Sequence, residues 1–164
     1  MSRRTAGFTL IELLIVIAVI AVLAAILVPG LISAIGRTAD VQTQQLIQSV
    51  DQALEDYKDR VHLRGMYPPT EENPQFSTHG IVHVLDENEL FDFRDQDISK
   101  IPGSDDDWEL IDGWNEGMRY QRWAGVQNPP ETARNPRRFD LYSAGEDNDW
   151  DTELIGNWSE MDEE

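Results

Sequence analysis

An uncharged run from Leu13 to Gly36 constrains the fold of this chain more than any other feature of its sequence. The run holds about 24 residues, and a helix rises ~1.5 Å per residue, so it spans roughly 36 Å. That length exceeds the ~30 Å hydrocarbon core of a bilayer. Arg3 and Arg4 precede the run and predict a cytoplasmic N-terminus. The sequence therefore predicts one membrane-spanning helix, with the rest of the chain on the far side of the membrane.

Glu12 lies at the start of this apolar segment and argues against a plain membrane anchor. A carboxylate inside an apolar span costs about 2.5–3.5 kcal/mol on insertion scales, and a plain anchor has no use for it. A buried charge is tolerated when it is paired, and the apolar run offers no partner. A secretory signal is shorter and ends in small residues, but no clear Ala-x-Ala site lies between Leu27 and Arg37. Glu12 therefore indicates a partner outside the run.

The string from Gly7 to Val16, GFTLIELLIV, resembles the class III signal of type IV pilins and type II secretion pseudopilins. The resemblance implies that a prepilin peptidase removes the leader 1–7 by cutting between Gly7 and Phe8. It also implies methylation of the new Phe8 amine. In the family, the carboxylate at the position of Glu12 pairs with the N-terminal amine of a neighbouring subunit. Residues 8–36 would then form the membrane-spanning part and later the filament core.

The helical pattern continues past the membrane segment. Apolar residues recur at helical spacing as Val41, Leu46, Val50, Ala53, Leu54, Tyr57 and Val61, which predicts one amphipathic helix from Phe8 to about Leu63. Pro29-Gly30 interrupts it and predicts a kink or melted turn. Pilins often carry a proline at this place, so we expect Pro29 to allow local unwinding in an assembled filament.

The remainder predicts a small globular part, within a domain spanning 37–158. Gly65 ends the long helix, and Ser77 is expected to cap a short helix that reaches about Leu90. The segments 118–124 and 138–143 read as strands. The predicted fold class is α+β, with a long N-terminal helix packed on a small antiparallel sheet. The acidic tail 159–164 is expected to be disordered.

Four further strings resemble the major pseudopilins of type II secretion systems. They run from Tyr67 to Glu71, from Asp112 to Tyr120, from Phe139 to Asp147 and from Ile155 to Trp158. Gly113 stands where that branch usually has proline. The segment 74–107 has no counterpart in the branch.

The loop after the third string is a candidate calcium site. In major pseudopilins this loop binds calcium, and the resemblance implies Asp147 and the Ala144 carbonyl as ligands. Asp149, Asp151 or Glu153 would complete the six to eight oxygens that calcium prefers. The simpler interpretation is a solvated acidic loop, because the whole chain is acidic.

Composition excludes several other kinds of site. The chain has no cysteine, which excludes disulfides, thiolate zinc sites and iron–sulfur clusters. Its net charge of -18 argues against nucleic-acid binding, which requires clustered Lys and Arg. His79 and His83 have a zinc-compatible spacing, but exposed or capping histidines are the simpler interpretation. Asp105 to Asp107 read as a solvated loop without catalytic context. The five tryptophans are expected mainly in the core: Trp108, Trp114, Trp123, Trp150 and Trp158.

These features predict a structural protein without enzymatic activity. The resemblance implies a subunit of a type II secretion pseudopilus, which would help to export folded proteins across the outer membrane. The expected partners are other copies of the chain, minor pseudopilins, the inner-membrane assembly platform and the prepilin peptidase. Before assembly, the chain would sit in the inner membrane with its globular domain in the periplasm. The alternatives are a surface type IV pilin and a membrane-anchored periplasmic binding or enzymatic domain.

Overall fold

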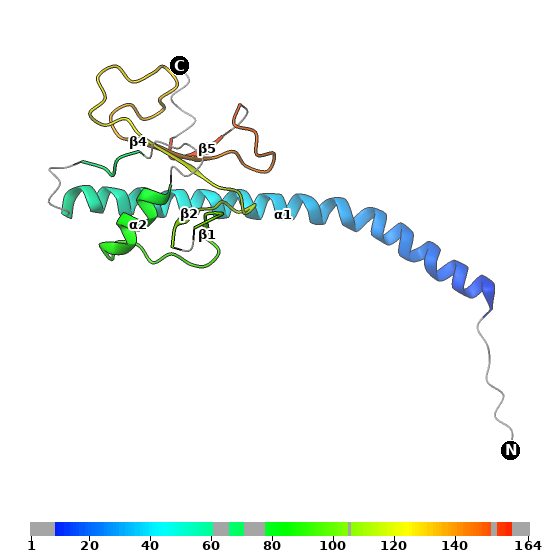
Figure 1. The fold of residues 1–164 in the computed structure, drawn as a ribbon. Helices are drawn as coiled ribbons and strands as arrows, with labels where there is room; N and C mark the ends of the chain where they lie inside the picture. The colour runs from blue at the N-terminus through cyan, green and yellow to red at the C-terminus, as the bar shows by residue number, and fades with distance from the viewer. Residues whose placement is uncertain (1–8, 61–65, 71–77, 105, 152–153, 159–164) are drawn as a thin grey trace. The chain divides into compact units, whose positions relative to one another are not determined.

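The computed structural model describes residues 9–60, 66–70, 78–104, 106–151 and 154–158 (Figure 1). The chain forms two compact units, one up to Arg37 and the other from Thr38 onward. Helix α1 (Leu10–Arg60) contributes residues to both units.

The first unit is the apolar part of α1. The stretch Leu10–Val28 has a mean hydropathy of 3.2, none of it is buried, and it is long enough to cross a membrane. Helix α1 continues through Pro29 and Gly30, so of the two alternatives expected there, a kink or a melted turn, the melted turn is absent. The i→i−4 bond that proline cannot make is one loss in a long ladder, and the remaining bonds preserve the helix. Unwinding of this place in a filament remains a prediction.

In the second unit, one face of α1 forms the centre of the core. Its fully buried members are Ile47, Val50 and Leu54, and Leu46, Ala53 and Tyr57 are nearly so. Two details differ from the predicted face. Val41 is 50% exposed, and Ile47, which the spacing argument left out, is 1% exposed. Val61 lies outside the described residues.

A three-stranded antiparallel sheet packs on this helical face. It has the order β3 (Arg119–Arg122), β4 (Phe139–Ser143) and β5 (Ile155–Gly156). Tyr120 pairs with Leu141 across β3 and β4. Both side chains are buried, as alternation along a strand requires of residues that share one face. The two strands predicted over 118–124 and 138–143 are thus confirmed as β3 and β4, and so is the α+β, pilin-like fold.

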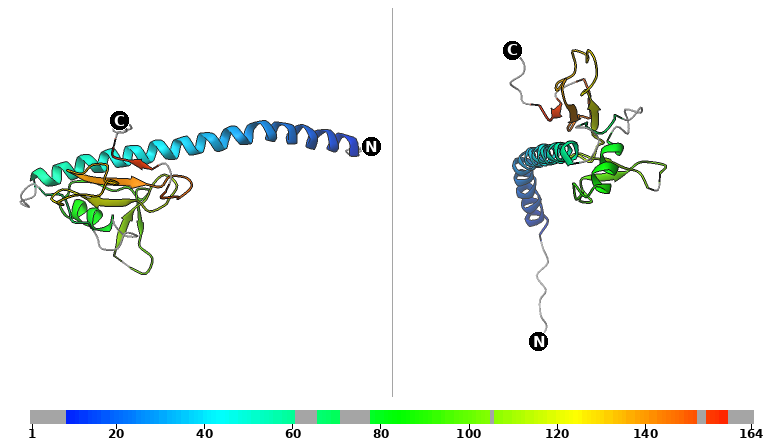
Figure 2. Two further views of the ribbon diagram at one scale, coloured as in Figure 1. Left: turned by 90° about the horizontal axis from the view of Figure 1, so that it is seen from above. Right: turned by 90° about the vertical axis from the view of Figure 1, so that its left-hand side faces the viewer.

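The segment without a family counterpart adds a second layer (Figure 2). It contains α2 (His79–Glu87) and β1 (Ile98–Lys100), and β1 pairs with β2 (Trp108–Leu110), which directly follows the segment, in a two-stranded sheet. Helix α2 buries Ile81, Val82 and Leu85, as predicted. The N-cap of α2 is Thr78, whose hydroxyl accepts a hydrogen bond from the Leu110 N–H instead of capping the helix. Ser77, the predicted cap, lies outside the described residues.

Candidate functional site

The polar end of the apolar helix is organised by Thr9 and Glu12. The Glu12 Oε2 atom accepts hydrogen bonds from the Thr9 N–H at 2.8 Å and from its hydroxyl at 2.6 Å. The Thr9 hydroxyl oxygen in turn accepts from the Glu12 N–H at 3.4 Å. This is a reciprocal capping box, which satisfies donors that the first turn of a helix leaves open. Sequence reasoning missed Thr9, although the Thr-x-x-Glu pattern before an apolar run is its signature.

The capping box gives the Glu12 carboxylate hydrogen bonds but no opposite charge. The carboxylate does have a hydrogen-bond partner in its own chain, directly before the apolar run. Thr9 supplies two hydrogen bonds but no positive charge, so the capping box leaves the negative charge uncompensated. Pairing with an amine of another copy therefore stays a prediction. Gly7 and Phe8, the predicted cleavage pair, lie outside the described residues.

In the second unit, two of the motif strings meet at Asp112. One of its oxygens accepts from the N–H groups of Trp114 and Glu116, at 2.9 and 3.0 Å. The other accepts from the Ser143 hydroxyl at 2.5 Å. Asp112 and Ser143 are both buried, so this carboxylate joins the loop before β3 to the end of β4.

The same loop shows why glycine stands at position 113. The Gly113 N–H donates to the Thr43 hydroxyl at 2.9 Å, and that hydroxyl donates to the Ala39 carbonyl at 2.9 Å. A Cβ atom on Gly113 would lie 2.6 Å from the Ala39 Cα and would overlap the Ala39 carbonyl oxygen. Proline, the usual residue of the branch, lacks the N–H that Thr43 receives. The local geometry thus requires a residue with an N–H and no side chain.

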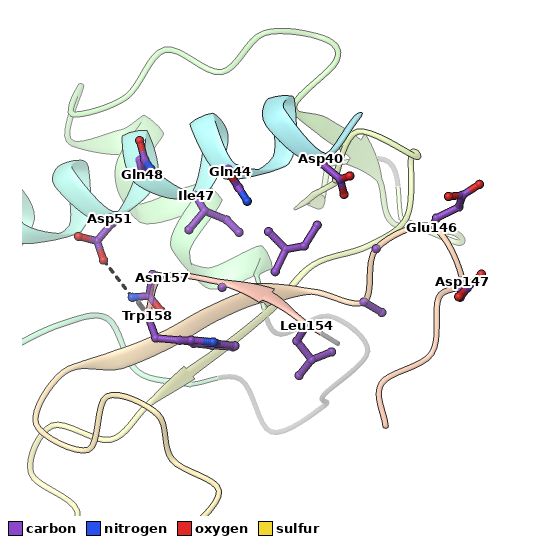
Figure 3. A pocket seen from close by; sticks show the side chains of 14 residues that line it. Asp40, Gln44, Ile47, Gln48, Asp51, Glu146, Asp147, Leu154, Asn157 and Trp158 are labelled. Carbon is purple, nitrogen blue, oxygen red and sulfur yellow. Dashed lines mark hydrogen bonds between the residues drawn. The ribbon is translucent and has the colours of Figure 1, made fainter. Parts of the chain in front are cut away.

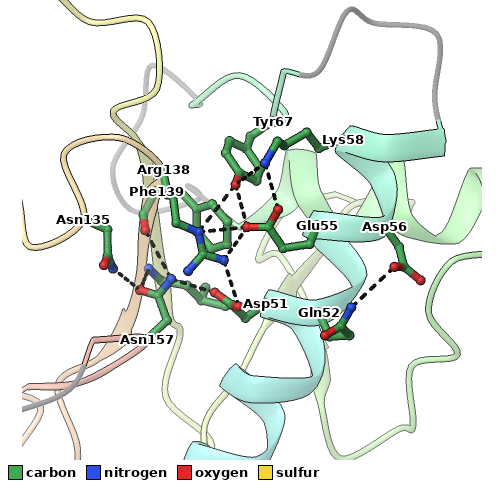
Figure 4. A network of polar contacts seen from close by, with 11 residues as sticks. Asp51, Gln52, Glu55, Asp56, Lys58, Tyr67, Asn135, Arg138, Phe139 and Asn157 are labelled. Atoms are coloured by element: carbon green, nitrogen blue, oxygen red, sulfur yellow. Dashed lines mark hydrogen bonds and ion pairs between the residues drawn. The ribbon is translucent and has the colours of Figure 1, made fainter.

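Asn157 connects the last string to the helix (Figure 4). Its amide nitrogen donates to Asp51 at 2.9 Å and to the Phe139 carbonyl at 3.2 Å. Its amide oxygen accepts from the Leu141 N–H at 3.0 Å and from Asn135 at 3.1 Å. All four hydrogen bonds that an asparagine amide can make are formed, which fixes the position of β5 against β4 and α1.

Arg138 adds the ionic part of this network (Figure 4). Its guanidinium donates to Asp51 at 3.0 Å and to Glu55 at 2.8 Å, and Glu55 also accepts from Tyr67 at 2.6 Å and Lys58 at 3.0 Å. Burial raises the pKa of Glu55, but the hydrogen bonds from Tyr67, Lys58 and Arg138 outweigh burial and lower that pKa overall. Burial lowers the pKa of Arg138, and bonds to Tyr67, Asp51 and Glu55 raise it overall.

The candidate calcium loop does not form a ready site among the described residues. Ala144 is buried, whereas Asp147, Asp149 and Asp151 are exposed. Asp149 accepts from the Asp151 N–H at 3.0 Å, so part of this loop is held by its own hydrogen bonds. No three acidic or histidine side chains gather closely enough to hold a metal in the part of the chain that the structure describes. Glu153 lies outside that part, and calcium binding stays a prediction.

A polar groove lies between α1 and the end of the sheet (Figure 3). Its volume is about 1060 Å³. Helix α1 contributes one wall with Asp40, Gln44 and Gln48, and the loop after β4 contributes Glu146 and Asp147. Half-buried apolar side chains line the rest: Leu154, Ile155 and Trp158.

The tryptophans differ in part from their predicted place in the core. All five are half-buried, and of these Trp108 packs against the core cluster. The Arg119 guanidinium lies 3.6 Å from the centre of the Trp150 ring, and Tyr142 packs against both Trp150 and Trp158. Since Arg119 and Tyr142 are paired across β3 and β4, these rings cover the face of the sheet that points away from the core.

His79 and His83 have separate roles. His79 lies beside Asp107 and the Trp108 carbonyl, and His83 lies beside Glu87 on its own helix. Asp107, half-buried, accepts a hydrogen bond from the Ser104 hydroxyl, and Asp106 is exposed, in keeping with a loop.

Comparison with known proteins identifies the N-terminal segment. Residues 2–28 match the model of the prokaryotic N-terminal methylation motif. The chain is 63% identical over 38 residues to the type IV wide pilus major component PilA4 of Thermus thermophilus. This similarity covers 23% of the present chain and 29% of that relative. No solved structure matches. The N-terminal segment of this chain is therefore similar to the N-terminal methylation segment of type IV pilin-like proteins.

Proposed function

We propose that this chain is the structural subunit of a helical filament, built from copies that wait in a membrane before assembly. The observation that carries the proposal is Glu12, an acidic side chain at the start of a fully exposed apolar span, held by Thr9 without a compensating charge. Leaving this span in water is unfavourable by roughly 25 cal/mol per Å² of apolar surface. A membrane covers it first, and neighbouring helices cover it in a filament.

The assembly step explains the charge. When apolar helices pack together, an unpaired carboxylate among them costs several kcal/mol, and a nearby amine removes that cost. Cleavage between Gly7 and Phe8 would create such an amine on Phe8, four residues before Glu12. Four helical residues rise about 6 Å. A parallel copy shifted by that distance along the helix axis would therefore bring its amine level with Glu12 of its neighbour.

Within this class, we favour the pseudopilus of a type II secretion system, which would help to move folded proteins across the outer membrane. Support comes from the strings that resemble major pseudopilins, because their polar residues bond to one another in the second unit. Asp112 bonds to Ser143, and Asn157 bonds to the backbone of β4. Minor pseudopilins, an inner-membrane platform and a prepilin peptidase would be the partners of such a subunit.

A surface type IV pilus is the second candidate. The observation that favours it is the name of the similar protein, a major component of a type IV wide pilus. That likeness is confined to 38 residues, in the part of the chain where the two kinds of filament resemble one another, so it does not choose between them.

The test uses the full chain in membranes that contain a prepilin peptidase and the assembly machinery of its host. We expect Glu12→Ala to abolish filaments in electron micrographs while the protein stays in the membrane and keeps its thermal unfolding. Asp95→Ala is the matched control, since Asp95 is an exposed acidic residue outside the apolar helix, and its filaments should persist. Filaments of normal length from Glu12→Ala would refute the proposal.

Deletion of the gene in the host organism distinguishes a pseudopilus from a surface pilus. Deletion of the gene should stop export of folded proteins if the filament is a pseudopilus, and should remove surface fibres without affecting export if it is a pilus.

A further inference from the structure

The groove beside α1 has chemically different ends. At one end lie Asp40, Glu146 and Asp147, and none of them forms an ion pair with another described residue. At the other end lie Asn157 and Trp158, and the Arg134 guanidinium lies 5.9 Å from the Trp158 ring. The acidic end therefore presents three carboxylates without an ion-pair partner among the described residues, and its negative potential favours a positively charged occupant.

The segment between β3 and β4 offers the complementary chemistry. In a chain of net charge -18, residues 124–138 carry three arginines and a single acidic residue, Glu131. Arg138 is used inside the polar network, whereas Arg137 is exposed and has no ion pair with any described residue. Val126 on the same segment is 47% exposed. The segment thus presents the positive charge of Arg137 together with the apolar side chain of Val126. The groove presents carboxylates together with apolar side chains, so the two surfaces are complementary.

The two surfaces are separated along the helix axis. The base of the β3–β4 segment is held at Asp51 through Arg138, and the acidic end of the groove begins at Asp40. Eleven helical residues separate these positions, which is about 16 Å along α1. A second copy displaced along this axis brings its segment to the acidic end of the first.

We propose that the acidic end of the groove, formed by Asp40, Glu146 and Asp147, receives Arg137 from the β3–β4 segment of another copy, displaced by about 16 Å along the helix axis. This copy is a different neighbour from the one, about 6 Å away along the axis, whose amine meets Glu12. The contact joins two different surfaces, and such head-to-tail contacts generate open helical assemblies when the rotation between copies does not close into a ring. The inference rests on the proposed filament and adds the contact that sets the spacing of its outer domains. The segment 159–164 is a poor alternative occupant because four of its six residues are acidic.

The absence of cysteine from the chain allows a direct test. The full chain carrying Arg137→Cys and Glu146→Cys is produced in membranes with its assembly machinery, and is then mildly oxidised. We expect a ladder of disulfide-linked dimers and higher multimers on a non-reducing gel, well above the dimer background of each single variant. The matched control is Arg137→Cys with Asp95→Cys, because Asp95 is exposed but does not line the groove, and we expect no ladder from it.

The possible outcomes are distinguishable. Filaments of the double-cysteine chain that give no ladder would overturn this contact and leave the proposed filament intact. A cross-link to a different protein in place of a second copy would also overturn it. If the unmodified chain forms no filaments under the same conditions, the proposed function fails, and this inference fails with it.

Discussion

Gly113 offers the sharpest test of how the second unit is built. Replacing it with alanine puts a Cβ 2.6 Å from the Cα of Ala39 and 2.8 Å from its carbonyl carbon. These atoms belong to the backbone of α1, so no side-chain rotation relieves the contact. The loop must move away, and it then loses the hydrogen bond from the Gly113 N–H to Thr43.

The magnitude follows from these two effects. Overpacking against a fixed neighbour costs about 1–3 kcal/mol, and the lost hydrogen bond costs about 0.5–1.5 kcal/mol. The sum is about 1.5–4.5 kcal/mol. In a domain of this size each kcal/mol lowers the melting temperature by about 3–5 °C, so we expect Gly113→Ala to lower it by about 5–22 °C.

Tryptophan fluorescence of the full chain in detergent is the assay, because all five tryptophans lie in the second unit. Gly117→Ala is the matched control. Its Cβ would meet only the flexible carboxylate of Glu109, at 3.1 Å, and its cost should be below about 1 kcal/mol. Equal melting temperatures for Gly113→Ala and the unmodified chain would refute the reasoning. So would a fully stable Gly113→Pro, because proline has no N–H for Thr43.

Three further predictions concern polar groups of the second unit. Asp140 is buried and accepts from the Trp123 indole and two backbone N–H groups, so Asp140→Asn should lower the free energy of unfolding by about 2–4 kcal/mol, measured by urea titration. Glu55 has a pKa below its ordinary value of 4.5, so its contribution to stability is complete above pH 4.5 and is lost as the pH falls through the lowered value. Glu55→Gln should therefore make stability depend less on pH below 4.5, measured by melting at a series of pH values. Calcium should raise the melting temperature of the chain in calorimetry relative to a chelator, and Asp147→Asn should reduce that rise.

Each of these has a result that would count against it. The Asp140 argument fails if Asp140→Asn is as stable as the exposed control Asp106→Asn. The Glu55 argument fails if both proteins lose stability equally on acidification. The calcium prediction fails if calcium and chelator give the same melting curve.

The sequence predicted the parts of the fold whose signals are local. The helical spacing of Leu46, Val50 and Leu54 and the alternation along 138–143 depend only on which face is buried, and both α1 and β4 follow from them. The hairpin of β1 and β2 was missed because each strand has three residues, too few to show alternation. The melted turn, one of the two alternatives predicted at Pro29, is absent because one missing hydrogen bond does not by itself open a long helix.

The site was predictable to a smaller extent. Motif strings named Asp112, Ser143 and Asn157. The bond between Asp112 and Ser143 spans 31 positions and that from the Leu141 N–H to Asn157 spans 16, and no local pattern encodes either. The role of Gly113 depends on the backbone of α1, and its bond to Thr43 spans 70 positions of the chain. Thr9 is different, because its capping pattern is visible in the sequence itself.

The four hydrogen bonds of Asn157 have a consequence for the order of events during synthesis. Asn157 joins Asp51 across 106 positions of the chain, so this bond forms only after nearly the whole domain has left the ribosome. Contacts of such long range slow folding because a large loop must close before they form. If the apolar helix is inserted into a membrane during synthesis, as proposed, its own domain is still unfolded at that time. A chain truncated before Asn157 would be anchored with an open sheet, a substrate for membrane proteases before it could join an assembly.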